Sequence, residues 1–401
     1  MIEEKHIYKL SSDIEFSKFN ENEYLLHNAK LNKYTKLNQK YHDLLILADG
    51  SRTVSQINVD FQKSHKLPIS DSQIVVLFSQ LKQYGAFGYD NSIKEQSKIP
   101  DYIKFGFIFL KPEIISKIVP FLKLLFVRKV FYSVIVFSII IFSYNIYENY
   151  YNNPTLNSNT FVPYFMLLLF ISTIFHELGH ASASHFFKTK HGGIGFGFYL
   201  YFIPAFFADV TDIWRLNKWK RIIVNSSGIY FEIIFCLILS IIGFFTKHHM
   251  LEILALVILV KGLYNLFPFL RADGYWILSD LLDKPNLNFH AMNNLKLIVL
   301  SIFKNEKLKL KKNDYLIALY GCFNIVMIGI FFYYQIFLNW HSIVDFPTTI
   351  YNIIISIFQW KFNLSFNELF KILSVLIFYI ISIKITVGIM KKLLLFFKHT
   401  K

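Results

Sequence analysis

Charged residues are scarce in this chain of 401 residues: 17% are Asp, Glu, Lys or Arg, against about 25% in soluble domains. Cysteine is scarcer still, because Cys236 and Cys322 are the only two, and they lie in separate apolar runs. This excludes a disulfide framework and a cysteine-based metal site. The opening residues, Met1 to His6, lack the apolar core of a signal peptide, so we expect the N-terminus to stay in the cytosol.

Hydrophobic residues are abundant instead, at 54% of the sequence, and include 44 Phe and 24 Tyr. Several runs reach the roughly 20 apolar residues that a helix needs to cross a hydrocarbon core. The sequence therefore predicts a mainly α, polytopic membrane protein in contact with the lipid bilayer. About six transmembrane helices are expected, at residues 130–146, 162–187, 222–245, 251–270, 315–338 and 369–390.

The formal net charge of +15 comes from Lys and Arg residues that lie mostly between the apolar runs. With six spans and both termini in the cytosol, every basic cluster falls on the cytosolic side, as the positive-inside rule requires. Because the basic residues form no single block, we expect no nucleic-acid partner. The frequent Lys, Asn, Ile and Phe indicate an AT-rich, bacterial genome, and therefore a multi-pass protein of the bacterial plasma membrane.

Four regions follow one another along the chain. Residues 1–97 predict a small α+β domain, with strands near 7–10 and 24–26 and three short helices between 38 and 85, the third capped by Ser70. The segment 192–207, rich in glycine and aromatic residues, predicts extended chain, and 348–360 predicts a short surface or re-entrant helix. The other regions are a linker with a membrane-surface helix (98–129), a membrane core (130–285), and a cytosolic loop with the C-terminal transmembrane helices (286–401).

The second predicted span contains the run His176-Glu177-Leu178-Gly179-His180. A helix places the two histidines one turn apart on the same face, where both can bind one zinc ion. Glu177 is then placed to act as the general base that takes a proton from an attacking water. Ionisable residues at membrane depth are costly, which favours a functional site over a chance match to the motif.

A catalytic zinc usually has three protein ligands, so two histidines do not complete the site. His185 lies on the opposite side of the same helix, whereas Asp273 follows the fourth span on the membrane side that the motif also faces. We therefore expect Asp273 to be the third ligand; its alternative role is a helix cap. Asn265 is expected to contact the substrate, or else to form a polar contact between helices. Another divalent ion is an alternative to zinc, since their affinities overlap.

Together, the His-Glu-x-x-His motif and the Asn-x-x-Pro-x(4)-Asp-Gly motif that begins at Asn265 resemble the site-2 protease family of intramembrane zinc metalloproteases. The likeness covers roughly residues 105–285, and Asp209, Trp214 and Gly228 resemble its peptide zinc metalloprotease branch. It implies a site-2-protease-like core in which the two histidines and the aspartate hold zinc. The glutamate of the motif and Asn265 would then take part in cutting a peptide bond.

The first 97 residues are similar to PqqD-like domains, through Tyr41 to Leu45, Asp49-Gly50 and Gly85. In such domains a winged-helix fold binds a leader peptide as an added strand. This resemblance implies a precursor peptide with a leader as partner, and favours maturation of a ribosomally made, bacteriocin-like peptide. The alternatives are regulated proteolysis of a membrane-anchored signalling protein and a non-catalytic peptide-binding protein for immunity or export.

Overall fold

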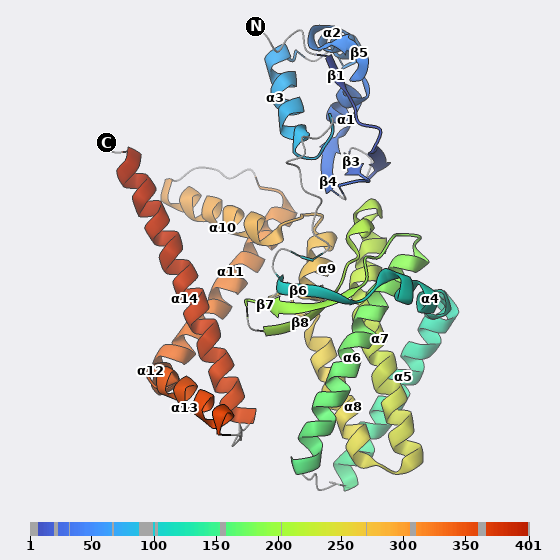
Figure 1. The fold of residues 1–401 in the computed structure, drawn as a ribbon, viewed down its shortest axis with the longest axis vertical. Coiled ribbons are helices and arrows are strands. Elements are labelled where there is room, and N and C mark those ends of the chain that lie inside the picture. Colours follow the sequence, from blue (N-terminus) through green and yellow to red (C-terminus); the bar gives the residue numbers. More distant parts are fainter. Residues whose placement is uncertain are drawn as a thin grey trace. The chain divides into compact units, whose positions relative to one another are not determined.

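The computed structural model describes residues 7–19, 23–31, 33–65, 68–87, 99–100, 103–152, 158–201, 203–269, 271–304, 310–359 and 366–399. These residues belong to two compact units. The first unit comprises Met1–Tyr199 and Pro204–Asp283, and the second comprises Leu200–Ile203 and Lys284–Lys401. Figure 1 shows the helices and strands of both units, coloured along the sequence.

The N-terminal part of the first unit is a small α+β domain. Its strands are β1 (Ile7–Lys9), β2 (Ile14–Lys18), β3 (Glu23–Asn28), β4 (Lys33–Asn38) and β5 (Asp49–Thr53), and its helices are α1 (Gln39–Ile46), α2 (Val54–His65) and α3 (Asp71–Lys82). The strands form two antiparallel sheets, β1-β5 and β2-β3-β4. Leu44, Ile57 and Phe78 lie in its apolar core. The two predicted strands and three predicted helices are confirmed, and β2, β4 and β5 are additional.

The start of α3 has the predicted cap. Ser70 Oγ accepts a hydrogen bond from the Gln73 N–H, and the Gln73 side chain accepts one from the Ser70 N–H. This reciprocal pair satisfies two backbone donors that a helix start would otherwise leave without partners. The chain turns at Gly85, which has a φ of +70°, as predicted for the residue that ends this helix.

Four helices form a bundle in the remainder of the first unit (Figure 1). They are α5 (Arg128–Asn152), α6 (Ser158–Phe186), α7 (Lys218–Thr246) and α8 (His249–Tyr264). α7 is the central helix, because it packs against each of the other three. Phe142, Phe235 and Ile258 belong to the apolar core that the helices share, and burial of such side chains stabilises the bundle's internal contacts.

Five helical segments are long and apolar enough to cross a membrane, as expected of a membrane protein. They are Arg128–Asn152, Thr160–Phe186, Lys218–Thr246, Lys312–Leu338 and Lys371–Met390, and they coincide with five of the six predicted spans. The other predicted span corresponds to α8, which has 16 residues and is about 24 Å long, against a hydrocarbon core of about 30 Å. Its predicted end at residue 270 lies outside the described residues, so a sixth span stays a prediction.

A three-stranded sheet lies beside the bundle in Figure 1. Its strands are β6 (Ile103–Leu110), β7 (Ile194–Tyr199) and β8 (Ile203–Ala208), in the order β6-β7-β8. β7 and β8 confirm the extended chain predicted for residues 192–207. β6 was not predicted within the linker, where the helix is α4 (Pro112–Leu122), followed by the short helix η1 (Lys123–Phe126). The strand depends on pairing with β7, far away in sequence, which a local pattern does not contain.

The described residues of the second unit are mainly helical. The helices are α10 (Leu287–Lys304), α11 (Lys312–Tyr333), the π-helical turn η3 (Tyr334–Leu338), α12 (Trp340–Val344), α13 (Phe346–Phe358) and α14 (Phe366–His399). α13 confirms the short helix predicted for residues 348–360. α10 lies where a cytosolic loop was predicted, and it packs closely on α11, since a Cβ at Gly321 would lie 3.0 Å from the Ala291 carbonyl oxygen.

Candidate metal centre

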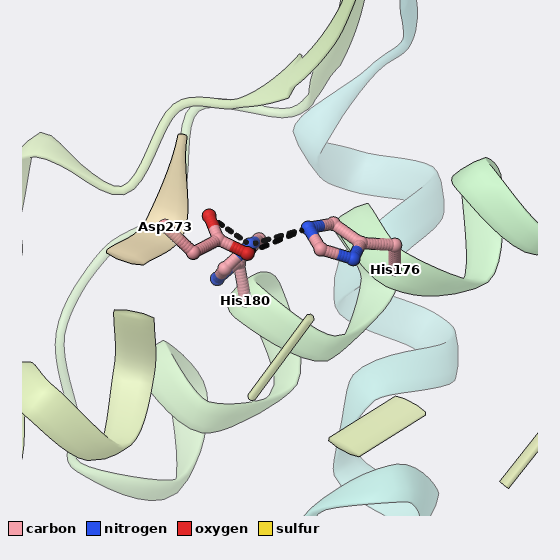
Figure 2. Close-up of side chains that lie close together, drawn as sticks. All are labelled: His176, His180 and Asp273. Atoms are coloured by element: carbon pink, nitrogen blue, oxygen red, sulfur yellow. Dashed lines mark hydrogen bonds and ion pairs between the residues drawn. The ribbon is translucent and has the colours of Figure 1, made fainter. Parts of the chain in front are cut away.

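Three expected ligands converge in the first unit. His176 and His180 project from one face of α6, and Asp273 is the first residue of α9 (Asp273–Leu281). Figure 2 shows the Asp273 carboxylate pointing at both imidazoles. The ligand atoms of the three residues lie within 4.8 Å of one another, and all three side chains are largely buried. The structure therefore brings together two residues of one helix and a third from nearly a hundred residues downstream.

The spacing of these atoms fits a zinc ion. His176 Nε2 lies 3.2 Å from His180 Nε2, Asp273 Oδ2 lies 3.0 Å from His176 Nε2, and Asp273 Oδ1 lies 3.4 Å from His180 Nε2. A tetrahedral zinc with bonds of about 2.0–2.1 Å would separate its ligand atoms by about 3.3 Å. Two imidazoles and a carboxylate, without a thiolate, form the ligand set of hydrolytic zinc sites, which leaves a fourth position for water.

The protons on the two rings support the same conclusion. His180 Nδ1 lies 2.8 Å from the Val224 carbonyl oxygen, which can only accept, so Nδ1 carries the hydrogen. His176 Nδ1 lies 3.1 Å from a carboxylate oxygen of Glu232. In the neutral imidazoles, both Nε2 lone pairs then face the oxygens of Asp273, and these acceptors repel one another unless a cation lies among them. No described residue donates a hydrogen bond to Asp273 Oδ2, and an oxygen that binds a metal ion needs no such donor.

The loop between α8 and α9 holds Asp273 in position. The Gly274 N–H donates to the Asn265 carbonyl oxygen at 2.8 Å, which closes the loop onto the end of α8. A Cβ at Gly274 would lie 2.0 Å from the Leu266 carbonyl oxygen, so only glycine fits there. Ligands bind metal ions in their deprotonated form, so Asp273 would hold the ion as a carboxylate.

A buried ion pair ties α9 to the start of α7. Arg221, which is 2% exposed, donates through Nε to Asp280 Oδ1 at 2.6 Å, and Asn225 Nδ2 donates to Asp280 Oδ2 at 2.9 Å. Both oxygens of Asp280 are therefore bound from α7. Charge-assisted hydrogen bonds of this kind are directional as well as strong. They hold α9 in place and therefore fix the position of Asp273, its first residue.

Two glycines let α6 and α7 approach closely beneath the imidazoles. A Cβ at Gly179 would lie 2.4 Å from the Ser227 carbonyl oxygen, and a Cβ at Gly228 would lie 2.5 Å from Nε2 of both His176 and His180. Small residues at a helix crossing allow such close backbone contact within membranes. The α7 backbone therefore closes one side of the metal-ligand group.

Glu177 lies next to the ligands in sequence and is buried with them, at 7% exposure. Its carboxylate lies near the backbone of Ala208, the last residue of β8. The expected general base is therefore close to one end of a strand at the edge of the three-stranded sheet.

Asn265 lies at the end of α8, next to the loop that carries Asp273. It is the C-cap residue of α8, and its backbone carbonyl accepts from Gly274, which supports the Asp273 loop. Contact between its side chain and a substrate stays a prediction. Two residues that were not expected at the site are Glu232, which contacts His176, and Lys261, which contacts Glu232. The available signal was a charged residue inside each of two predicted spans.

Part of the chain is similar to a protein of Bacillus subtilis. The sequence is 26% identical over 138 residues to the "Putative peptide zinc metalloprotease protein YydH" of Bacillus subtilis (strain 168). The match covers 34% of this chain and 55% of that protein, so the chain spans little more than half the length of this relative. No family model matches the sequence. No solved structure matches it either.

Proposed function

We propose that this protein is an intramembrane zinc endopeptidase that cuts a peptide bond of a precursor peptide. The observation that carries the proposal is the convergence of His176, His180 and Asp273 at the spacing of a tetrahedral metal site, with Glu177 beside them. The distant likeness to a protein named as a peptide zinc metalloprotease supports the same reaction class.

The chain's own residues would perform the proton transfers. A zinc ion held by the two histidines and Asp273 would supply Lewis-acid polarisation of the scissile carbonyl and of water. Glu177 takes a proton from the attacking water and passes it to the leaving amine, so that one carboxylate serves as base and then as acid.

The edge strand β8 suggests how the substrate is held. A helical peptide has its amides paired internally and must be extended before its carbonyl can be attacked. In the order β6-β7-β8, β8 has a neighbour on one side only among the described strands. A peptide added along β8 would gain main-chain hydrogen bonds and run toward Glu177, which lies near the end of this strand.

The N-terminal domain favours a delivered substrate. It offers a three-stranded antiparallel sheet, β2-β3-β4, to whose edges a leader peptide could add as a further strand. This supports maturation of a small ribosomally made peptide, such as a bacteriocin, over regulated proteolysis of a signalling protein. Neighbouring genes separate the two: a short precursor gene favours maturation, and an anti-sigma factor gene favours signalling.

The test measures metal content and cleavage together. Wild type and Glu177→Gln are purified in detergent, zinc per chain is counted, and each is incubated with the short peptides encoded beside the gene and with casein. We expect near-stoichiometric zinc in both, and cleavage at least about 100-fold slower in the variant, because it lacks the general base. Zinc-free wild type, or identical behaviour of the two proteins, would favour a non-catalytic peptide-binding protein instead.

A further inference from the structure

Glu232 lies near the middle of α7, a helix long and apolar enough to cross a membrane, and it is fully buried. A carboxylate at that depth is costly unless it is paired and hydrogen-bonded. It belongs to neither motif of the metal centre, and the proton transfers assigned to Glu177 do not use it. The side chains around Glu232 therefore indicate its role in the bundle.

Three side chains from two neighbouring helices surround the Glu232 carboxylate. Lys261 Nζ, from α8, donates to Oε1 at 2.5 Å, and Ser172 Oγ, from α6, donates to the same oxygen at 3.2 Å. His176 Nδ1 lies 3.1 Å from the other oxygen, Oε2. One carboxylate oxygen is thus tied to the bundle, and the other is directed at an imidazole of the metal-ligand group.

The backbone of α8 packs closely against the same carboxylate. A Cβ at Gly262 would lie 2.7 Å from Glu232 Oε2, so the oxygen that contacts His176 has a helix directly behind it. Oε2 cannot withdraw from the ring unless α7 and α8 separate. Because Lys261 holds Oε1 at the same time, the carboxylate has one orientation, and that orientation limits rotation of the His176 ring.

We propose that Glu232 is a positioning residue of the metal centre and that Lys261 is the cation that holds it in place. Glu232 accepts the hydrogen of His176 Nδ1, which leaves Nε2 as the metal-binding atom and makes the imidazole a stronger donor. The Val224 carbonyl oxygen accepts the corresponding hydrogen of His180 Nδ1. The inference rests on the proposed function, because it takes the bound ion to be zinc. The contact between the Glu232 carboxylate and the His176 imidazole is independent of which ion binds.

Glu252 of α8 provides a matched control within the same bundle. It is also a buried carboxylate, 2% exposed, and it accepts from Asn149 Nδ2 at 3.2 Å and lies 3.3 Å from His249 Nδ1. These partners are not the expected metal ligands. If Glu232 only ties helices together, glutamine at position 232 and glutamine at position 252 should have the same consequences.

The test uses the full chain in detergent and two readouts other than cleavage. The zinc dissociation constant is measured by competition with a chromophoric chelator, and the visible spectrum is recorded after cobalt replaces zinc. We expect Glu232→Gln to weaken zinc binding by roughly 10- to 100-fold and to shift the cobalt absorption. Glu252→Gln should change neither. An unchanged zinc affinity and cobalt spectrum in Glu232→Gln, or equal losses in both variants, would overturn the proposal.

Lys261→Met keeps the proposal testable if Glu232→Gln does not fold. The Lys261 side chain is 36% exposed, so methionine can replace it without a new cavity. We expect zinc binding about 10-fold weaker, the low end of the range for groups behind a ligand. The double variant should bind zinc no more weakly than Glu232→Gln alone, since both changes act through one carboxylate. Additive losses, or an unchanged affinity in Lys261→Met, would overturn the role given to Lys261.

The two proposals fail in different ways. A wild-type protein that binds no zinc would overturn the proposed function as a zinc endopeptidase. A wild-type protein that binds zinc with an affinity independent of residue 232 would overturn only the positioning role. Cleavage lost in Glu177→Gln but zinc affinity lost in Glu232→Gln would support both, because the two carboxylates would then have separate tasks.

Discussion

Two glycines of α7 lie against polar side chains, and the two places differ in what the glycine touches. A Cβ at Gly228 would lie 2.5 Å from Nε2 of both His176 and His180, whereas a Cβ at Gly243 would lie 2.7 Å from Cγ of Glu252. At Gly228 the neighbouring atoms are those that would bind a metal. At Gly243 the neighbour is the aliphatic part of a side chain whose carboxylate has other partners.

A histidine beside a buried carboxylate is therefore not enough to make a metal centre. His249 and Glu252 come as close as 3.3 Å, and Asn149 adds a further polar group, but their acceptors do not converge on one point with a third ligand. Asn145 is also fully buried in this region, and neither its Oδ1 nor its Nδ2 has a partner among the described residues. Convergence of ligand atoms, set by the backbone beneath them, distinguishes the site near Gly228.

Removing a ligand should have the largest effect. In His180→Ala the site keeps one imidazole and one carboxylate, which is too few for a catalytic zinc. We expect zinc to fall from near one per chain to near zero, with loss of cleavage, as measured by elemental analysis of the protein in detergent. His249→Ala is the matched control and should keep its zinc. Retention of zinc in His180→Ala would contradict the ligand assignment.

Much of this site follows from the sequence, for a physical reason. His176, Glu177 and His180 lie within one helical turn, so their geometry is local and any helix provides it. Asp273 could be proposed because the predicted spans put it on the same membrane side as the motif. Glu232 and Lys261 could not be assigned, because their role depends on how α6, α7 and α8 pack, and no local spacing contains that.

The fold shows the same division between local and distant information. Helices with long apolar runs and the Ser70 cap were predicted, since each depends on neighbouring residues. β6 was missed, because a short apolar run is compatible with either a strand or a helix until its partner is known. α8 is shorter than the span predicted for it, since the chain leaves the helix after Tyr264 to form the loop that carries Asp273.

Adding one methyl group beneath the imidazoles should have the next largest effect. Two carbon atoms in contact lie about 3.5–4.0 Å apart, so Gly228→Ala must displace both rings by about 1 Å. A displacement of that size can cost about 100-fold in rate even without loss of a ligand. We expect kcat/KM to fall by about this factor and the cobalt spectrum to change. Wild-type rates in Gly228→Ala would mean that the rings are not held as described.

The same methyl group at Gly243 should have the smallest effect and the opposite pattern. In Gly243→Ala the added carbon meets Glu252 Cγ, and the Glu252 backbone nitrogen at 3.2 Å, so the outcome is overpacking at the α7–α8 contact. Overpacking of this kind costs about 1–3 kcal/mol, and we expect a lower midpoint of thermal unfolding in detergent. Zinc content and cobalt spectrum should match the wild type, because none of the ligands is touched. A change of the cobalt spectrum in Gly243→Ala that equals the change in Gly228→Ala would show that general loosening of α7, and not contact with the imidazoles, accounts for both.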